Sequence, residues 1–148
     1  MTAPRRPVTI IVLSESMRSL ILEEQARQSG RFLEGVDLQA YLAKLGDRSE
    51  IVSNSAQGRC RGFVAFYCND ESSRQAYITL VLVDPRDRST GLGRSLVREV
   101  LDIAKRRGYR SCRLEVAKQN EAAYAMYTSM GFRVVEDRTA KDLLEIAL

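Results

Sequence analysis

The feature that most constrains the fold is a hydrophobic segment that leads through a glycine-spaced loop into an amphipathic helix. Ala76–Val83 is a nearly continuous run of β-branched and aliphatic residues, typical of a central strand covered on both faces. Gly91 and Gly93 lack a Cβ atom, so a ligand can approach the loop backbone closely. Apolar residues then recur at helical spacing over Leu92–Ala104, and Gly108 ends the helix. This succession predicts a fold that combines helices with a sheet.

The rest of the chain alternates between predicted strands and helices. Strands are expected at Val8–Leu13, Glu50–Ser53, Gly62–Tyr67, Cys112–Val116, Phe132–Val135 and Leu143–Ala147. Helices are expected at Ser14–Gly30, Asp37–Gly46 and Glu121–Met130, with turns at Asn54–Gly58 and Cys68–Arg74. The resulting order is β-α-α-β-β-β-α-β-α-β-β. We predict one α/β (α+β) domain over residues 1–148, in which residues 1–7 form a flexible arm.

Composition excludes several kinds of chemistry. The chain contains no histidine, which excludes histidine-based zinc sites, Ser-His-Asp triads and Cys-His dyads, and no metal is expected. Cys60, Cys68 and Cys112 have no CxxC spacing, so we expect reduced packing residues in a cytoplasmic protein. The apolar run Val8–Leu13 is too short to span a membrane. Catalysis would therefore depend on carboxylates, tyrosines, backbone amides or a bound cofactor.

Positive charge is concentrated around the glycine loop. The net charge of the chain is +4, whereas residues 86–113 carry nine basic and three acidic residues, a local excess of +6. The N-terminal N–H groups of the predicted helix, flanked by Arg88 and Arg94, suit an anion. A solvated helix face accounts for the other basic residues, and interleaved aromatics that would indicate nucleic acid are missing. A small phosphate ligand is the favoured partner.

Two motifs carry a resemblance to a known family. Arg88–Gly93 reads R-x-x-G-x-G after a strand with V-x-P, and it matches neither a Walker loop nor a dinucleotide fingerprint. The second motif follows the pattern L-x-V…N…A…Y…GF and consists of Leu114, Val116, Asn120, Ala123, Tyr127, Gly131 and Phe132. Together they resemble the GNAT superfamily of acyl-CoA-dependent N-acetyltransferases over residues 76–135. The resemblance implies a mixed, mostly antiparallel sheet of six to seven strands flanked by helices.

The resemblance also implies acetyl-CoA as acyl donor. Its pyrophosphate would bind the amides from Ser89 to Arg94, and its pantetheine arm would lie between the strands that end near Val83 and Val116. A backbone N–H near Leu82 would bind the thioester oxygen and stabilise the oxyanion of the transition state. The cofactor site implied in this way comprises Val81, Leu82, Val83, Arg88, Ser89, Thr90, Gly91, Leu92, Gly93, Arg94 and Asn120.

Tyr127 matches the tyrosine that protonates the departing thiolate, and the alternative is that it only packs on its helix. Glu115 lies twelve residues before Tyr127, a spacing that resembles the acid/base arrangement of the ribosomal-protein N-terminal acetyltransferase branch. Glu115 is therefore a candidate base, or else a solvated carboxylate paired with Arg113. Direct attack with proton loss to water stays open. Glu34, Asp70 and Glu71 are further candidates for the base, in segments expected to border the acceptor pocket, and Tyr124 is the nearest tyrosine that could be mistaken for the acid.

The resemblance thus implies a cytoplasmic enzyme that moves acetyl from acetyl-CoA to a primary amine, with a small molecule as the expected acceptor. Alternatives are an acetyltransferase that acts on a protein N-terminus or on tRNA, or a non-catalytic acyl-CoA-binding regulatory module. No membrane partner is expected. Homodimers are common among relatives of this kind, so a homodimer is one expected form.

Overall fold

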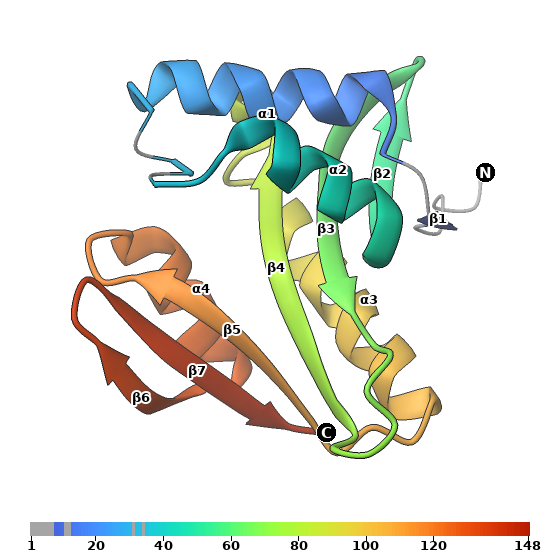
Figure 1. Cartoon of the computed structure of the whole chain (residues 1–148), viewed down its shortest axis with the longest axis vertical. Helices are drawn as coiled ribbons and strands as arrows, with labels where there is room; N and C mark the ends of the chain where they lie inside the picture. Colours follow the sequence, from blue (N-terminus) through green and yellow to red (C-terminus); the bar gives the residue numbers. More distant parts are fainter. Residues whose placement is uncertain (1–7, 11–12, 31, 34) are drawn as a thin grey trace. The chain divides into compact units, whose positions relative to one another are not determined.

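The computed structural model in Figure 1 describes residues 8–10, 13–30, 32–33 and 35–148, so the predicted arm of residues 1–7 and Glu34 lie outside the described residues. The described strands form one seven-stranded sheet, in the order β1 (Val8–Ile10), β2 (Glu50–Ala56), β3 (Arg59–Tyr67), β4 (Gln75–Val83), β5 (Ser111–Ala117), β7 (Lys141–Ala147) and β6 (Arg133–Arg138). The β4–β5 pair is parallel, whereas β1–β2, β5–β7 and β6–β7 are antiparallel. The predicted mixed α/β class and the predicted order of elements are confirmed.

The chain divides into two compact units. The first comprises residues 1–65 and 80–99, and the second comprises residues 66–79 and 100–148. Elements of the first unit are β1 (Val8–Ile10), α1 (Glu15–Arg27), α2 (Leu38–Arg48), β2 (Glu50–Ala56) and the 3-10 turn η1 (Pro85–Asp87). Elements of the second are β5 (Ser111–Ala117), α4 (Glu121–Met130), β6 (Arg133–Arg138) and β7 (Lys141–Ala147). Three elements contribute to both: β3 (Arg59–Tyr67), β4 (Gln75–Val83) and α3 (Leu92–Arg106).

Helices α1 and α2 begin where the sequence predicts and bury one face each. The Ser14 hydroxyl accepts from the Met17 N–H, and the Asp37 carboxylate accepts from the first amides of α2. The core of the first unit comprises Leu13, Met17, Leu20, Ile21, Leu42, Leu45, Ile51, Cys60, Phe63, Ala65, Leu80 and Leu82. Helix α2 continues past Gly46, where the sequence predicts its end, to Arg48. A glycine with helical neighbours weakens a helix without ending it.

The hairpin between β2 and β3 is tighter than predicted. The sequence predicts a turn over Asn54–Gly58, but β2 runs to Ala56 and only Gln57 and Gly58 form the turn. Both have positive φ, 55° and 74°, the combination that two-residue hairpins require. Asn54 has a high turn propensity, which strand pairing overrides here.

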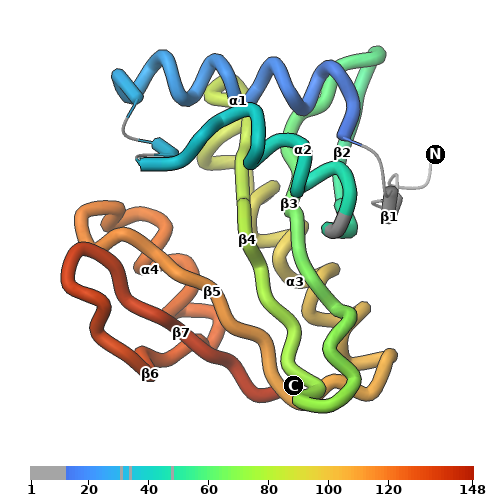
Figure 2. Tube along the Cα trace, viewed as in Figure 1, coloured from blue at the N-terminus to red at the C-terminus, as the bar shows by residue number. Residues whose placement is uncertain are grey.

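In the second unit α4 packs on one face of a three-stranded part of the sheet (Figure 1). The buried side chains of β5 alternate as predicted, with Cys112, Leu114 and Val116 inside. Asn120 caps the N-terminus of α4, and Gly131 ends it with a φ of 110°. Figure 2 traces the chain from there into the terminal β6–β7 hairpin.

The expectation that β4 is covered on both faces is wrong. Its even-numbered residues, Ala76, Ile78, Leu80 and Leu82, are buried, whereas the residues between them are half-buried. The strand therefore has one core face and one partly accessible face. An aliphatic run does not distinguish a strand buried on both faces from one whose second face is only partly covered.

Candidate active site

The glycine loop of the first unit ends in an exposed helix N-terminus. Helix α3 begins at Leu92, and its first described i→i−4 bond runs from the Ser95 N–H to the Gly91 carbonyl at 3.0 Å. The N–H groups of the preceding first turn have no partner within the helix. Its first turn contains no acidic residue, in contrast to α1 and α4, which begin with Glu15 and Glu121. This N-terminus therefore presents a positive dipole end without a side-chain carboxylate to neutralise it.

The conformation of the loop leaves its backbone accessible to a ligand. Ser89 and Gly91 have positive φ, 64° and 85°, and residues Arg88–Gly91 are exposed. Such alternation of backbone conformation turns successive N–H groups toward one concave surface. A Cβ built on Gly91 would meet no heavy atom within 4 Å, so its side is open. The Thr90 hydroxyl donates to the Asp87 carbonyl at 2.6 Å and so is turned back onto the loop.

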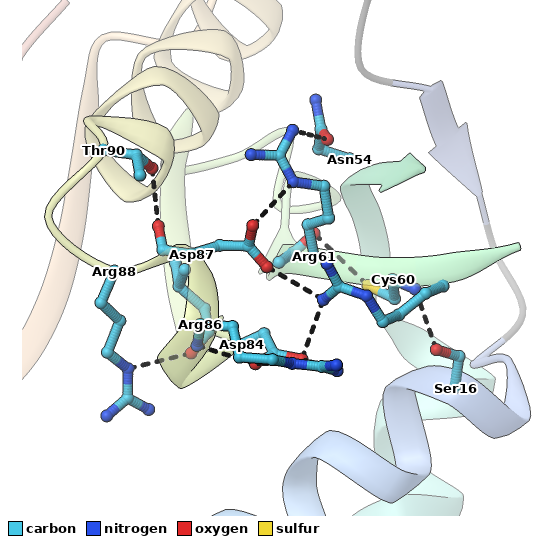
Figure 3. A network of polar contacts seen from close by, with 12 residues as sticks. Ser16, Asn54, Cys60, Arg61, Asp84, Arg86, Asp87, Arg88 and Thr90 are labelled. Atoms are coloured by element: carbon cyan, nitrogen blue, oxygen red, sulfur yellow. Dashed lines mark hydrogen bonds and ion pairs between the residues drawn. The ribbon is translucent and has the colours of Figure 1, made fainter. Parts of the chain in front are cut away.

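Two buried aspartates, which the sequence patterns do not single out, hold the turn before this loop (Figure 3). The Asp87 carboxylate accepts from Arg59 at 2.9 Å and from Arg61 at 3.0 Å, so the loop is tied to β3. The Asp84 carboxylate caps η1 by accepting from the Arg86 N–H at 3.0 Å, and it also accepts from Arg59. Hydrogen bonds from Arg86 hold the pKa of Asp84 well below its usual range, against the opposing effect of burial. The sequence signal for this anchor is Asp84 directly before Pro85, a helix-capping pattern.

The Arg88 side chain, predicted to flank the phosphates, is directed toward α1. Its Nη2 donates to Glu24 at 2.7 Å, and its Nε donates to the Val83 carbonyl at 3.0 Å. Glu24 is 5% exposed and also contacts Arg27 and Gln28. Burial raises the pKa of the Glu24 carboxyl, but hydrogen bonds from Gln28 and Arg88 outweigh it, and the net pKa lies below its ordinary value. Arg88 thus joins the end of β4, the loop and α1.

In the second unit Tyr127 lies buried on α4. It is 6% exposed, and its ring meets Phe132 edge-on with centroids 5.6 Å apart. Burial raises the pKa of its phenol above the ordinary value of 10. The hydroxyl therefore keeps its proton at neutral pH, as a general acid requires. The structural role that the sequence leaves open, packing on the helix, also fits this position.

Glu115 projects from the partly open face of β5. Its carboxylate accepts from the Tyr77 hydroxyl at 3.3 Å and pairs with Arg138 at 3.3 Å. The expected pairing with Arg113 is wrong, because Arg113 pairs with Glu145 across the β5–β7 ladder instead. Glu115 remains about one-third exposed and so is accessible to a small molecule.

The remaining predicted residues of α4 have clear local roles. Asn120 uses its side-chain oxygen as the N-cap, accepting from the Ala123 N–H at 3.3 Å. Tyr124 donates to the buried carboxylate of Asp142 at 2.7 Å. It lines a hollow of about 730 Å³ formed by Lys118, Glu121, Tyr124, Ala125, Thr128, Ser129 and Asp142.

The carboxylates of Asp70 and Glu71 lie in an exposed turn, and the cysteines lie in the protein interior. Asp70 accepts from Ser72 and Ser73, and these bonds, with Ser73 contributing most, lower the pKa of Asp70 to about 2. Glu71 is exposed in the same turn. All three cysteines are buried, and none forms a disulfide in the part of the chain that the structure describes. Among the described residues no helix is long and apolar enough to cross a membrane.

Comparison with known proteins identifies the family. The acetyltransferase (GNAT) family model matches residues 15–132, and the chain belongs to this family. The [ribosomal protein bS18]-alanine N-acetyltransferase of Escherichia coli K12 is 40% identical over 58 residues, 39% of each protein. The glucosamine 6-phosphate N-acetyltransferase of Trypanosoma brucei brucei is 29% identical over 119 residues, 75% of this chain and 78% of that protein. The matches span less than half the length of the first curated relatives.

Solved structures share the fold at low identity. A GCN5-related N-acetyltransferase from Kribbella flavida has a TM-score of 0.74 and 18% identity, covering 99% of this chain and all of that one. The PaiA N-acetyltransferase of Thermoplasma acidophilum, solved with coenzyme A, has a TM-score of 0.65 and 20% identity over 91% of this chain and 80% of that one. At such identities the likeness supports the fold alone.

Proposed function

We propose that this protein transfers the acetyl group of acetyl-CoA to a primary amine by direct nucleophilic attack. The observation that carries the proposal is the α3 N-terminus, where the exposed residues Arg88–Gly91 of the R-x-x-G-x-G motif lead into a helix with no acidic residue in its first turn. Membership of the family supplies the reaction class. The T. acidophilum neighbour solved with coenzyme A is consistent with this cosubstrate.

The pyrophosphate of acetyl-CoA binds the amides of Ser89–Arg94, the helix dipole and the Arg94 side chain. The Asp84 and Asp87 anchors hold these amides in place before the ligand arrives, which lowers the entropic cost of binding. Val81–Val83 offers backbone groups to the pantetheine arm, and a backbone N–H near Leu82 donates to the thioester oxygen. This bond strengthens as negative charge develops on that oxygen, and so it lowers the barrier.

The amine nitrogen attacks the thioester carbon with its lone pair, and collapse of the tetrahedral intermediate breaks the C–S bond. Tyr127 gives its proton to the departing thiolate, and the proton that the acylated nitrogen still carries passes through water to the phenolate. The products are the N-acetyl amine and CoA with a free thiol, and Tyr127 is again protonated. Burial keeps the phenol protonated at neutral pH, so its proton is available to the thiolate, although a thiolate is somewhat less basic than a phenolate.

Glu115 takes the proton that the incoming ammonium must lose before attack. Tyr77 orients its carboxylate, Arg138 pairs with it until the amine arrives, and its partial exposure admits the amine. The spacing of Glu115 and Tyr127 supports a paired base and acid on neighbouring elements of one unit. The alternative is that the ammonium loses this proton to water, after which the neutral amine attacks directly.

The acceptor is a small amine. The T. brucei relative, which covers most of this chain, is named for a small phosphorylated amine. A protein N-terminus is the second candidate, because the E. coli relative named for bS18 alanine is 40% identical over 58 residues. Activity on N-terminal peptides and none on small amines would favour this second acceptor.

A free-thiol assay with Tyr127→Phe tests the mechanism. The substitution removes the proton donor but keeps the ring that packs on Phe132, so turnover should fall by about 10²-fold or more while acetyl-CoA affinity persists. Tyr124→Phe is the matched control, since it removes a hydroxyl bonded to Asp142 from the same helix and should retain turnover. Equal loss of turnover in both variants would refute the role of Tyr127.

A further inference from the structure

The partly open face of the second unit's sheet carries an ordered set of charges. Side chains that pair directly across antiparallel strands share a face. Arg113 lies opposite Glu145, which lies opposite Arg133, and Lys141 lies opposite Arg138 at the closed end of the β6–β7 hairpin. Glu115 belongs to the same face, because it alternates with the buried Leu114 and Val116.

Arg138 forms only a weak ion pair with the carboxylate of Glu115. Its Nη1 pairs with Glu115 at 3.3 Å, while its Nε and Nη2 contact Glu136 at 3.0 and 2.9 Å. The three side chains are 33–55% exposed. Ion pairs at this exposure contribute little to stability, so a ligand can replace them at low cost.

Lys141 adds a second cation beside Arg138. Lys141 is the cross-strand partner of Arg138, and it is exposed. Within the described part of the chain its ammonium has no hydrogen bond or ion pair. An ammonium that took the place of Arg138 on Glu115 would leave two cations here, and among the described ion pairs the exposed Glu136 is the carboxylate that stays on Arg138.

We propose that this face selects an amine that carries an anionic group, a phosphate or a carboxylate, with its ammonium on Glu115 and its anion on Arg138 and Lys141. The inference rests on the proposed function and specifies its acceptor. An amine without an anionic group would break the Glu115–Arg138 pair without giving the released guanidinium a new acceptor. A zwitterionic acceptor replaces both halves of that pair at once.

The test compares matched amines that differ in the anion. Glucosamine 6-phosphate with glucosamine forms the phosphate arm, and 4-aminobutyrate with n-butylamine forms the carboxylate arm. Each is titrated calorimetrically into the protein saturated with CoA, and each is assayed for acetyl transfer. We expect the anionic member of one pair to bind at least about tenfold more tightly. The pair that shows the preference identifies the anion, and no preference in either pair would overturn the proposal.

Arg138→Gln and Lys141→Gln should each reduce the preference for the anionic member, and together they should abolish it. Arg133→Gln is the matched control, because it removes the same charge from the other end of β6 and should keep the preference. Equal losses in Arg133→Gln and Arg138→Gln would mean general electrostatic attraction and would contradict a specific anion site. An N-terminal peptide bound more tightly than any of the four amines would likewise overturn it.

Failure of the proposed function gives a different result. If acetyl-CoA does not bind, the transferase proposal fails, and the same amines titrated without CoA still test the charged face. Binding of the anionic amine without acetyl transfer would support the anion site and refute catalysis.

Discussion

Glu24 offers a sharp test of how the loop is anchored, because a buried carboxylate occupies a core-facing position of α1. Met17, Leu20 and Ile21 precede it on the buried side of the helix. Glu24→Ala removes the acceptor for Arg88 at 2.7 Å and the contacts to Arg27 and Gln28. The loop would then lose its link to α1, while the Asp84 and Asp87 anchors would remain.

The expected cost follows from burial. A hydrogen bond to a charged group contributes about 1.5–3 kcal/mol when buried. Arg88 and Arg27 are 42% and 43% exposed, so water solvates them after the substitution. The decrease in the free energy of unfolding is therefore closer to that of a surface ion pair than to that of a buried one. We expect a decrease of about 1–2 kcal/mol in the free energy of unfolding. Glu23→Ala, which removes an exposed carboxylate one residue earlier, should change it by less than about 0.5 kcal/mol.

Urea unfolding monitored by circular dichroism measures both variants. The folded-state pKa of Glu24 lies below its ordinary value of 4.5, so its contribution is fully present above pH 4.5 and is lost as the pH falls through the folded-state pKa. The gap between the two variants should therefore narrow in acid. Equal stabilities at neutral pH would refute the anchoring role of Glu24.

Two further predictions concern backbone and thiols. Gly131→Ala forces an L-residue to a φ of 110° with its Cβ 3.4 Å from Ile146. The free energy of unfolding, measured by thermal unfolding, should fall by about 1–2 kcal/mol. Gly46→Ala within α2 meets no atom within 4 Å and should stabilise, so a change of the same sign in both variants would contradict the backbone argument. Burial raises the pKa of Cys60 to about 11 and of Cys112 to about 12. Iodoacetamide at pH 8 should therefore label these thiols in urea but not in the native protein, as measured by mass spectrometry, and rapid native labelling would contradict their burial.

Local signals predict the elements well where caps and periodicity agree. Asn120 and Gly131 bound α4 at the predicted residues, because an N-cap and a left-handed glycine act within one turn of chain. The α1 pattern is less reliable. Ala26 fits its apolar stripe by spacing but is exposed, whereas Glu24 is buried. The partner that makes burial of Glu24 tolerable is Arg88, 64 residues away, which helical periodicity does not reveal.

In the candidate site, too, some residues can be predicted from local sequence, whereas their contacts with distant elements cannot. The glycine loop and the α4 motif are contiguous in sequence, and so their residues can be named from the sequence alone. The Asp87–Arg59 and Glu115–Arg138 pairs join elements distant in sequence, and their partners depend on strand register. Arg113 illustrates the limit. Proximity in sequence suggests Glu115 as its partner, but the β5–β7 register places Glu145 directly opposite.

Calorimetric titration with acetyl-CoA tests the central claim, that the exposed amides at the start of α3 bind the cosubstrate. Gly91→Glu would place a carboxylate in the open space beside these amides and should abolish binding that the unaltered protein shows at micromolar concentration. Gly58→Glu is the matched control, since Gly58 has a similar φ of 74° and open surroundings in the β2–β3 turn. Binding lost only in Gly91→Glu is the predicted result, and undetectable binding of millimolar acetyl-CoA to the unaltered protein would contradict the claim.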